Sequence, residues 1–274
     1  AGINIKPPIN ITCHLIHEDP SCLEMRPFHF ILYFFFICNI ACIAVAQNIS
    51  PMQQYQACME KTENFPKEAF EDAIQWQSEG GGDPARHCAA SALMALGLYL
   101  EAAKRLETLA HSVTKGPQFR GSVLNQAVSA WLMAENPERA EAVASAALKL
   151  APKLLSLFVS RAKARAKLGD YIGAKTDLDI ALKGDPNNPI ALAFRAAALR
   201  HLNRMSAALS DANAALAIDA RCSEALLERG ILKRLAGDKL GARKDWLRIL
   251  ELAPDTNAAN IARSNIERMD LNIQ

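Results

Sequence analysis

Small and apolar side chains recur at a fixed interval through the second half of the chain. Alanine and leucine each recur every 34 residues, at Ala140, Ala174, Ala208 and Ala242 and at Leu148, Leu182, Leu216 and Leu250. Units then close with a proline, at Pro152, Pro186 and Pro254, or with Ala220. This length accommodates two helices and two turns, with alanine where helices approach closely and proline where a helix cannot continue. The pattern predicts an all-α array of helical hairpins.

The units differ in how well they keep this spacing. Four of them run in step, over 121–154, 155–188, 189–222 and 223–256, and the first is the most degenerate, with Glu135 and Pro137 at its turn. Units 50–82 and 83–115 are out of step with these four, because Gly116–Phe119 forms a short insertion. Residues 257–274 predict a single helix that caps the exposed end of the array.

Unit 155–188 carries the clearest motif of the chain. It has Gly169 and Tyr171 at the turn between its helices, Ala174 at the start of the second helix, and Pro186 at its end. This set resembles the tetratricopeptide repeat (TPR) family. The resemblance implies a right-handed TPR-type α-solenoid, with a divergent N-terminal hairpin at 47–82, TPR repeats at 83–256 and a capping helix at 257–274. It also implies a binding scaffold whose first helices line a concave groove.

The segment 25–46 has a different composition. Arg26 follows Met25, an apolar run extends from Phe30 to Ile43, and the segment ends in Ala44-Val45-Ala46. These are the three parts of a signal peptide, so we expect cleavage after Ala46 and a periplasmic or secreted protein of the exported bacterial type. The alternative is an uncleaved inner-membrane anchor at Phe28–Ala46, which is near the lower limit of about 17 residues for a membrane span. Residues 1–24 are expected to be a leader or a non-native extension.

Composition and charge favour a folded protein with a protein partner. Half of the residues are hydrophobic, 22% are charged, and the formal net charge is +2. Disorder is therefore not expected, and no charge excess favours nucleic acid or an anionic membrane as the main partner. We expect a protein or peptide partner, and membrane contact only if the signal segment is uncleaved.

The sequence offers little catalytic chemistry. It lacks the zinc-protease His-Glu-x-x-His, the Gly-x-Ser-x-Gly elbow, a phosphate-binding Gly-Lys-Ser/Thr loop and a Cys-x-x-Cys pair. His87 and Cys88 are a base beside a possible nucleophile, but adjacent residues point about 100° apart on a helix. We therefore expect no enzyme activity, no cofactor and no metal site.

Three cysteines follow the predicted signal peptide. Cys58 and Cys88 are separated by 30 residues, close to one repeat, and first helices of successive repeats stack side by side. Their Cα atoms could therefore approach within the roughly 4.4 to 6.8 Å that a disulfide requires. We predict a Cys58–Cys88 disulfide, with two unpaired buried thiols as the alternative, and we expect Cys222 to be buried as a small apolar residue.

Charged residues share the 34-residue period. They are Arg161, Arg195 and Arg229 in the first helices, and Asp177, Asp211 and Asp245 in the second helices. A basic ladder for a ligand is one interpretation of the arginines. Structural ion pairs are the favoured one, because a partner that repeats at the same interval is what structural pairing requires.

The TPR resemblance also indicates which side chains line the groove. Those that packing does not require are Asn125, Ser129, Ser160, Lys163, Lys167, Phe194, Arg200 and Arg234. They predict a mixed groove with a basic tendency, and a merely solvated helix face around Lys163 and Lys167 is the alternative. Capture of a free C-terminal carboxylate is not favoured, because Val159, Ala193 and Leu227 stand where a clamp of this kind needs polar side chains.

Overall fold

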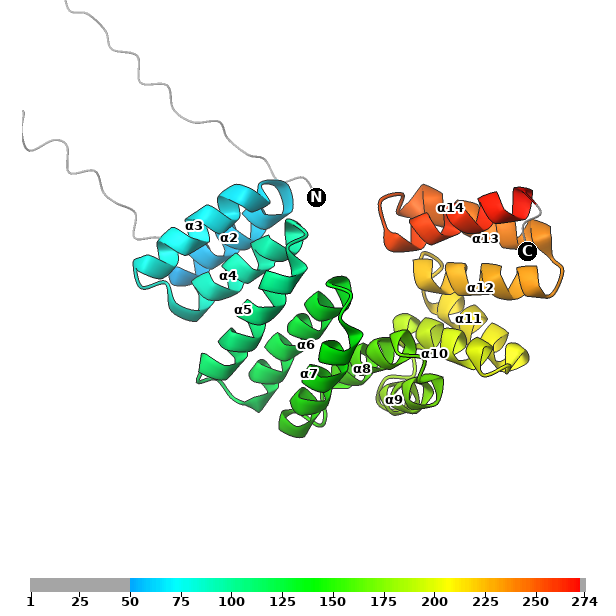
Figure 1. The fold of residues 1–274 in the computed structure, drawn as a ribbon, viewed down its shortest axis with the longest axis horizontal. Helices are drawn as coiled ribbons and strands as arrows, with labels where there is room; N and C mark the ends of the chain where they lie inside the picture. Colours follow the sequence, from blue (N-terminus) through cyan, green and yellow to red (C-terminus); the bar gives the residue numbers. More distant parts are fainter. Residues whose placement is uncertain (1–49, 272–274) are drawn as a thin grey trace, which may run out of the picture. The chain divides into compact units, whose positions relative to one another are not determined.

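The computed structural model describes residues 50–271, and this part of the chain is helical throughout (Figure 1). Its thirteen helices are α2 (Pro51–Asn64), α3 (Pro66–Ser78), α4 (Gly82–Ala95), α5 (Tyr99–Ser112), α6 (Pro117–Met133), α7 (Pro137–Leu150), α8 (Leu155–Lys167), α9 (Tyr171–Gly184), α10 (Pro189–His201), α11 (Met205–Ile218), α12 (Ser223–Leu235), α13 (Lys239–Leu252) and α14 (Asn257–Asp270). The all-α prediction is confirmed.

The predicted leader at 1–24, the signal peptide at 25–46 and the alternative anchor at Phe28–Ala46 lie outside the described residues. Among residues 50–271, no helix combines the length and the apolar character that crossing a membrane requires.

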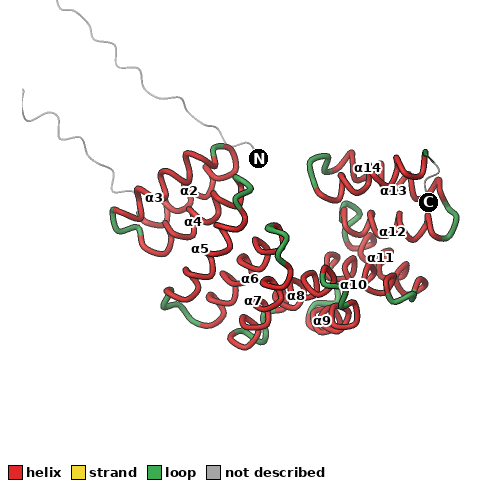
Figure 2. The backbone as a smooth tube through the Cα atoms, in the orientation of Figure 1, coloured by secondary structure: helices red, strands yellow, loops and turns green. Residues whose placement is uncertain are grey.

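Short turns connect the helices (Figure 2). Gly97, Gly169 and Gly237 follow first helices with φ of +74°, +81° and +87°, and Glu135 and Asn203 take the same place with φ of 55° and 61°. Glycine adopts this left-handed conformation without a steric penalty, whereas other residues pay for it. The turn geometry is therefore kept even in the units whose motif is degenerate.

Alanines fill the contacts between the helices. Ala140, Ala174, Ala208 and Ala242 are all fully buried. Leu148, Leu182 and Leu216 are also buried, while Leu250, in the last complete pair, is only partly covered. The periodic positions are thus the positions that hold the array together, and the contact they provide weakens toward its end.

The pairing of the helices changes at α6. From α6 onwards the closest neighbours are α6–α7, α8–α9, α10–α11 and α12–α13, but before it they are α3–α4 and α5–α6. The predicted insertion Gly116–Phe119 forms the cap and first turn of α6, which at 17 residues is the longest helix described. First helices pack directly on one another at α2–α4, α6–α8, α8–α10 and α10–α12, whereas α4 and α6 have at most marginal contact. The direct packing of successive first helices is therefore weakest between α4 and α6, next to the insertion.

Candidate functional site

The structure joins each periodic arginine to the aspartate of the same unit. Arg161 donates from Nη2 and Nε to the two carboxylate oxygens of Asp177, at 2.7 and 2.9 Å. Arg195 and Arg229 make the same two-bonded contact with Asp211 and Asp245, at 2.7 to 2.9 Å. The aspartate side chains are only 1%, 12% and 4% exposed. These arginines are therefore held by the fold and do not form a free basic ladder.

A third member of this network was missed by the sequence analysis. The remaining Nη1 of each arginine reaches back to the second helix of the preceding unit, to Ser145, Asp179 and Asn213 at 3.2, 3.0 and 3.4 Å. These three positions are also 34 residues apart. Because their side chains differ in type, only the spacing together with their shared polarity could have revealed them.

The charge states fit this pairing. The hydrogen bond to Asp177 raises the pKa of Arg161, and that to Asp211 does the same for Arg195. Burial alone would raise the pKa of Asp245, but hydrogen bonds from Arg229 and Lys233 bring it below its usual value. For Arg161, Arg195 and Asp245, the pKa thus moves in the direction that favours the charged form.

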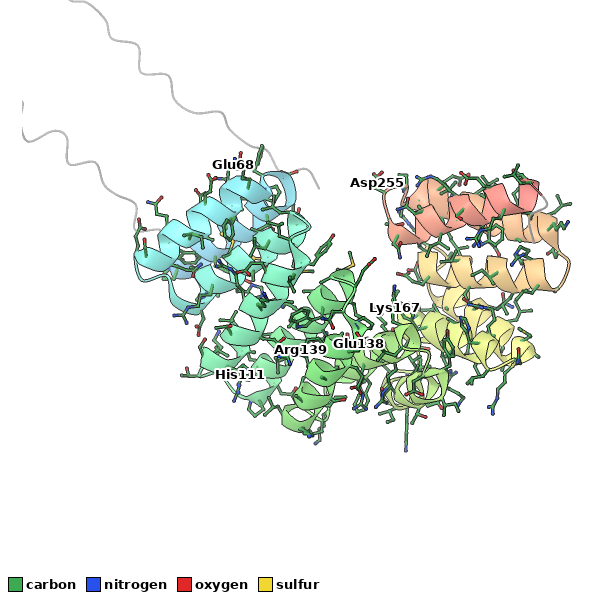
Figure 3. The ribbon with its side chains drawn as sticks, viewed as in Figure 1. Glu68, His111, Glu138, Arg139, Lys167 and Asp255 are labelled. Atoms are coloured by element: carbon green, nitrogen blue, oxygen red, sulfur yellow. A yellow bond between two sulfur atoms is a disulfide. The ribbon has the colours of Figure 1, made fainter. Side chains whose placement is uncertain are left out.

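Lys163 and Phe194 come together between α8 and α10. The Lys163 Nζ lies 4.5 Å from the centre of the Phe194 ring, within the range of a cation–π contact. Burial lowers the pKa of Lys163, although Glu224 on α12 opposes this effect. Lys167, one turn further along α8, is exposed (Figure 3). Arg234, in the last turn of α12, is exposed as well. We call Lys163, Lys167, Phe194 and Arg234 the first-helix face.

Four other predicted groove residues have different surroundings. Arg200 pairs with Glu228, which is only 5% exposed, and Ser160 is 7% exposed. Arg200 is therefore held in an ion pair between α10 and α12, and Ser160 is buried, so neither side chain is left free as the sequence led us to expect. On α6, Ser129 is exposed but donates to the Asn125 carbonyl, and the Asn125 Oδ1 is buried without a hydrogen-bond donor.

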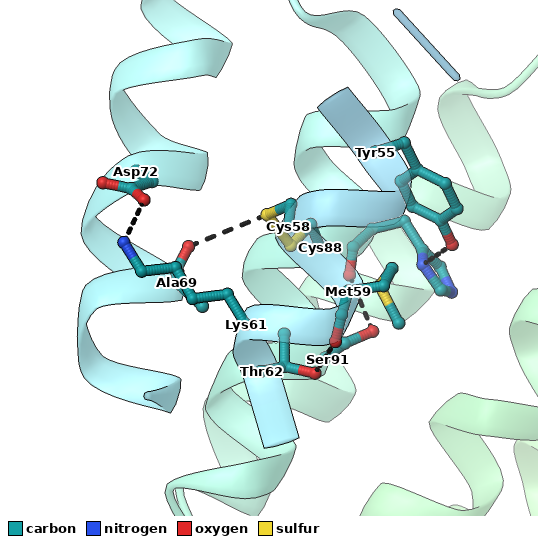
Figure 4. The surroundings of a disulfide bond; sticks show 10 residues. Tyr55, Cys58, Met59, Lys61, Thr62, Ala69, Asp72, Cys88 and Ser91 are labelled. Atoms are coloured by element: carbon teal, nitrogen blue, oxygen red, sulfur yellow. Dashed lines mark hydrogen bonds and ion pairs between the residues drawn. A yellow bond between two sulfur atoms is a disulfide. The ribbon is translucent and has the colours of Figure 1, made fainter. Parts of the chain in front are cut away.

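A disulfide joins Cys58 on α2 to Cys88 on α4, the pair that the sequence predicts, with the Cα atoms 6.2 Å apart (Figure 4). Because Cys88 is bonded to Cys58, it is not a free thiol beside His87, and it is also fully buried. Cys222 is buried and unbridged, and burial raises its pKa. In the described part of the chain, no group of His, Cys, Asp and Glu side chains is arranged to hold a metal ion.

His87 instead bridges three helices. Its Nδ1 lies 2.8 Å from the Tyr55 hydroxyl of α2, and its Nε2 lies 2.8 Å from the Gln126 Oε1 of α6. Since the amide oxygen can only accept, Nε2 carries the proton and Nδ1 accepts from Tyr55. Burial lowers the pKa of His87, which favours this neutral form. Tyr55 and Gln126 could not be predicted from the sequence, because neither belongs to a periodic set.

Comparison with known proteins identifies the fold. No protein-family model matches the chain. Over 90 residues it is 38% identical to RNA polymerase II-associated protein 3 of Rattus norvegicus, an alignment that covers 32% of this chain and 14% of that protein. The chain thus spans only a small part of this relative.

Two solved structures resemble most of the chain. A tetratricopeptide repeat protein from Parabacteroides merdae superimposes with a TM-score of 0.64 at 14% identity, over 81% of this chain and 86% of that one. The TPR protein TTC0263 of Thermus thermophilus gives 0.58 at 17% identity, over 68% and 99%. At such low identity, these similarities establish the fold alone.

Proposed function

From the TPR fold of this chain, we propose a non-enzymatic scaffold that binds a segment of a partner protein on the first-helix face, in the bacterial cell envelope. Scaffolds of this kind bind through exposed side chains on a preformed surface, and their function lies in that surface rather than in the fold. Binding is therefore assigned to the four residues of the first-helix face.

The single observation that carries the proposal is the Lys163–Phe194 contact. A half-buried ammonium group over an aromatic ring offers a partner both a cation and an apolar surface, and it requires no rearrangement. Lys167 adds an exposed positive charge one turn further along α8, and Arg234 adds another in the last turn of α12. A segment with acidic and apolar side chains suits this face best.

The arrangement does not favour a free C-terminal carboxylate as the main feature of the partner. Val159 and Ala193 are buried and apolar, and Leu227 is partly buried in the same cluster. A carboxylate placed there would lose its hydration without gaining hydrogen-bond donors. An internal segment is therefore the better fit.

The disulfide supports the envelope location. Disulfides persist in oxidising compartments and are rare where cellular thiols are kept reduced. Together with the predicted signal peptide at 25–46, the Cys58–Cys88 bond favours an exported protein. Mass measurement of protein isolated from a bacterial envelope should give an N-terminus at Gln47. A mass that retains Phe28–Ala46 would favour a membrane-anchored assembly factor.

Charge reversal tests the binding face. Lys163→Glu with Lys167→Glu should reduce cross-linking to the partner in the envelope and leave the helical circular dichroism unchanged. Lys153→Glu with Lys183→Glu, which also reverses two charges but at exposed positions outside this face, should cross-link like the wild type. Equal capture by both double variants, or a parallel loss of capture and thermal stability, would contradict the proposal.

A further inference from the structure

A recess with a volume of about 570 Å³ lies where α2, α4 and α6 meet. Met52, Phe119, Leu109 and Val123 supply most of its apolar wall, and the last two are only 3% and 2% exposed. Met52 and Phe119 stand at the opening, 65% and 38% exposed. The volume is within the range of about 300 to 1,000 Å³ that is usual for small-molecule sites.

The recess lies beside the point where the direct packing of first helices is weakest. Backbone packing between α4 and α6 is sparse, while the Cys58–Cys88 disulfide and direct packing hold α2 against α4. Tyr55, which lines the recess, lies on α2 about one turn before Cys58 (Figure 4). Covalent and packing contacts therefore join two of the walls, and Phe119 of the insertion lines the recess.

The polar side chains in the wall are already engaged. Tyr55, His87 and Gln126 form one chain of hydrogen bonds, and Asp83 pairs with Arg86 at 3.2 Å. Lys115 differs, because its Nζ lies 4.4 Å from the Phe119 ring and makes no ion pair with any described residue. One cation at the opening thus stands beside a mostly apolar interior.

We infer that this recess binds a free medium-chain carboxylate, with its hydrocarbon chain against Met52, Phe119 and Val123 and its carboxylate at Lys115. A peptide backbone would bring an N–H and a C=O for every residue, and the wall offers few groups to satisfy them. An acyl chain brings no such groups, and its single charge matches Lys115. This site is separate from the first-helix face and does not depend on the proposed scaffold function.

Calorimetric titration of the oxidised, full-length protein with decanoate, below its micelle concentration, tests the inference. We expect one saturable site, and weaker binding of decan-1-ol. Lys115→Gln should weaken decanoate about two- to fivefold, as expected for a partly exposed ion pair, and leave decan-1-ol unchanged. Lys153→Gln removes an exposed cation far from the recess and should change neither.

Phe119→Asp should weaken both ligands about tenfold, because it places a charge in the apolar wall. Ile172→Asp makes the same kind of change at an exposed position outside the recess and should bind like the wild type. If Phe119→Asp perturbs the fold, Phe119→Leu is the second test. It keeps an apolar side chain in the wall, so it should bind both ligands with most of the wild-type affinity. Non-saturable binding, or equal affinities in all variants, would overturn the inference.

The same titration separates this site from the first-helix face. Lys163→Glu with Lys167→Glu should bind decanoate with unchanged affinity, whether or not that variant loses its partner. If a short acidic peptide displaced decanoate from the wild type, the recess would be a peptide site, and the assignment to a free carboxylate would be wrong.

Discussion

The helices before α6 and the helices after α7 are held together by different chemistry. From α8 to α13, one polar arrangement repeats three times, with an arginine bonded to the aspartate of its own unit and to a polar residue of the preceding one. From α2 to α4, a disulfide, the histidine bridge and the Lys61–Asp72 ion pair take this place. A regular array can reuse one solution, whereas its irregular end needs contacts of its own.

The junction between these regions has yet another network. Glu107 on α5 accepts from the Trp131 indole on α6 and from Arg139 on α7, both at 2.5 Å. Arg139 is 52% exposed, while Glu107 is only 12% exposed (Figure 3 labels Arg139). The change in helix pairing at α6 therefore coincides with a change in the polar contacts that join successive helices.

The largest expected effect concerns the irregular end. Replacing both Cys58 and Cys88 with serine should lower the free energy of unfolding of α2–α4 by about 3 to 4 kcal/mol, because the bond closes a loop of about 30 residues. Hydrogen exchange should show faster opening of α2–α4 and little change in α10–α13. Cys222→Ser removes an unbridged thiol and is the control. Uniform loss of protection across the chain would show that the two regions unfold as one.

In the regular region, Asp211→Ala should cost about 1 to 3 kcal/mol, since Arg195 would keep only its contact with Asp179. Asp179→Ala should cost less, because Asp179 is 41% exposed while Asp211 is 12% exposed. Urea unfolding followed by circular dichroism measures both. Equal costs for the two variants would mean that burial does not set the strength of this network.

Much of the regular region could be predicted from its period. Repetition at 34 residues gives the helix pairs and the Arg–Asp partners, because two sets with one period must meet at the same place in every unit. Arg200–Glu228 could not be found this way, since it joins two first helices once, across 28 residues. The same applies to the contacts of His87, which depend on where an inserted turn places α6.

The next prediction compares two turns of the array. Glu135 has a left-handed backbone with φ of 55° where Gly169 occupies the equivalent turn of the following unit. Glu135→Gly should stabilise the protein by about 0.5 to 1 kcal/mol, because it relieves the penalty of a side chain in this conformation. Asn203→Gly, at φ of 61°, should change stability less, because asparagine tolerates the left-handed region. Thermal unfolding of both variants is the measurement, and an equal or larger gain at Asn203 would contradict this reasoning.

The smallest expected effect is the pH dependence that His87 adds to the irregular end. Burial lowers its pKa below the ordinary 6.5, so the unfolded chain takes up a proton at His87 more readily than the folded protein does. The contribution of neutral His87 to stability is therefore fully present above pH 6.5, and it falls as the pH is lowered through that value. The Tyr55 hydroxyl and the Gln126 amide face the ring, and Asp83 lies in the same recess.

Between pH 7.5 and pH 5.5, about one unit on either side of the ordinary pKa of histidine, His87→Gln should therefore lose less stability than the wild type. His201, whose pKa is also lowered, chiefly by burial, is present in both proteins and cancels in the comparison. His111→Gln, at an exposed position in the last turn of α5, should behave like the wild type (Figure 3). Identical pH profiles for the wild type and His87→Gln would show that the histidine bridge does not couple protonation to the fold.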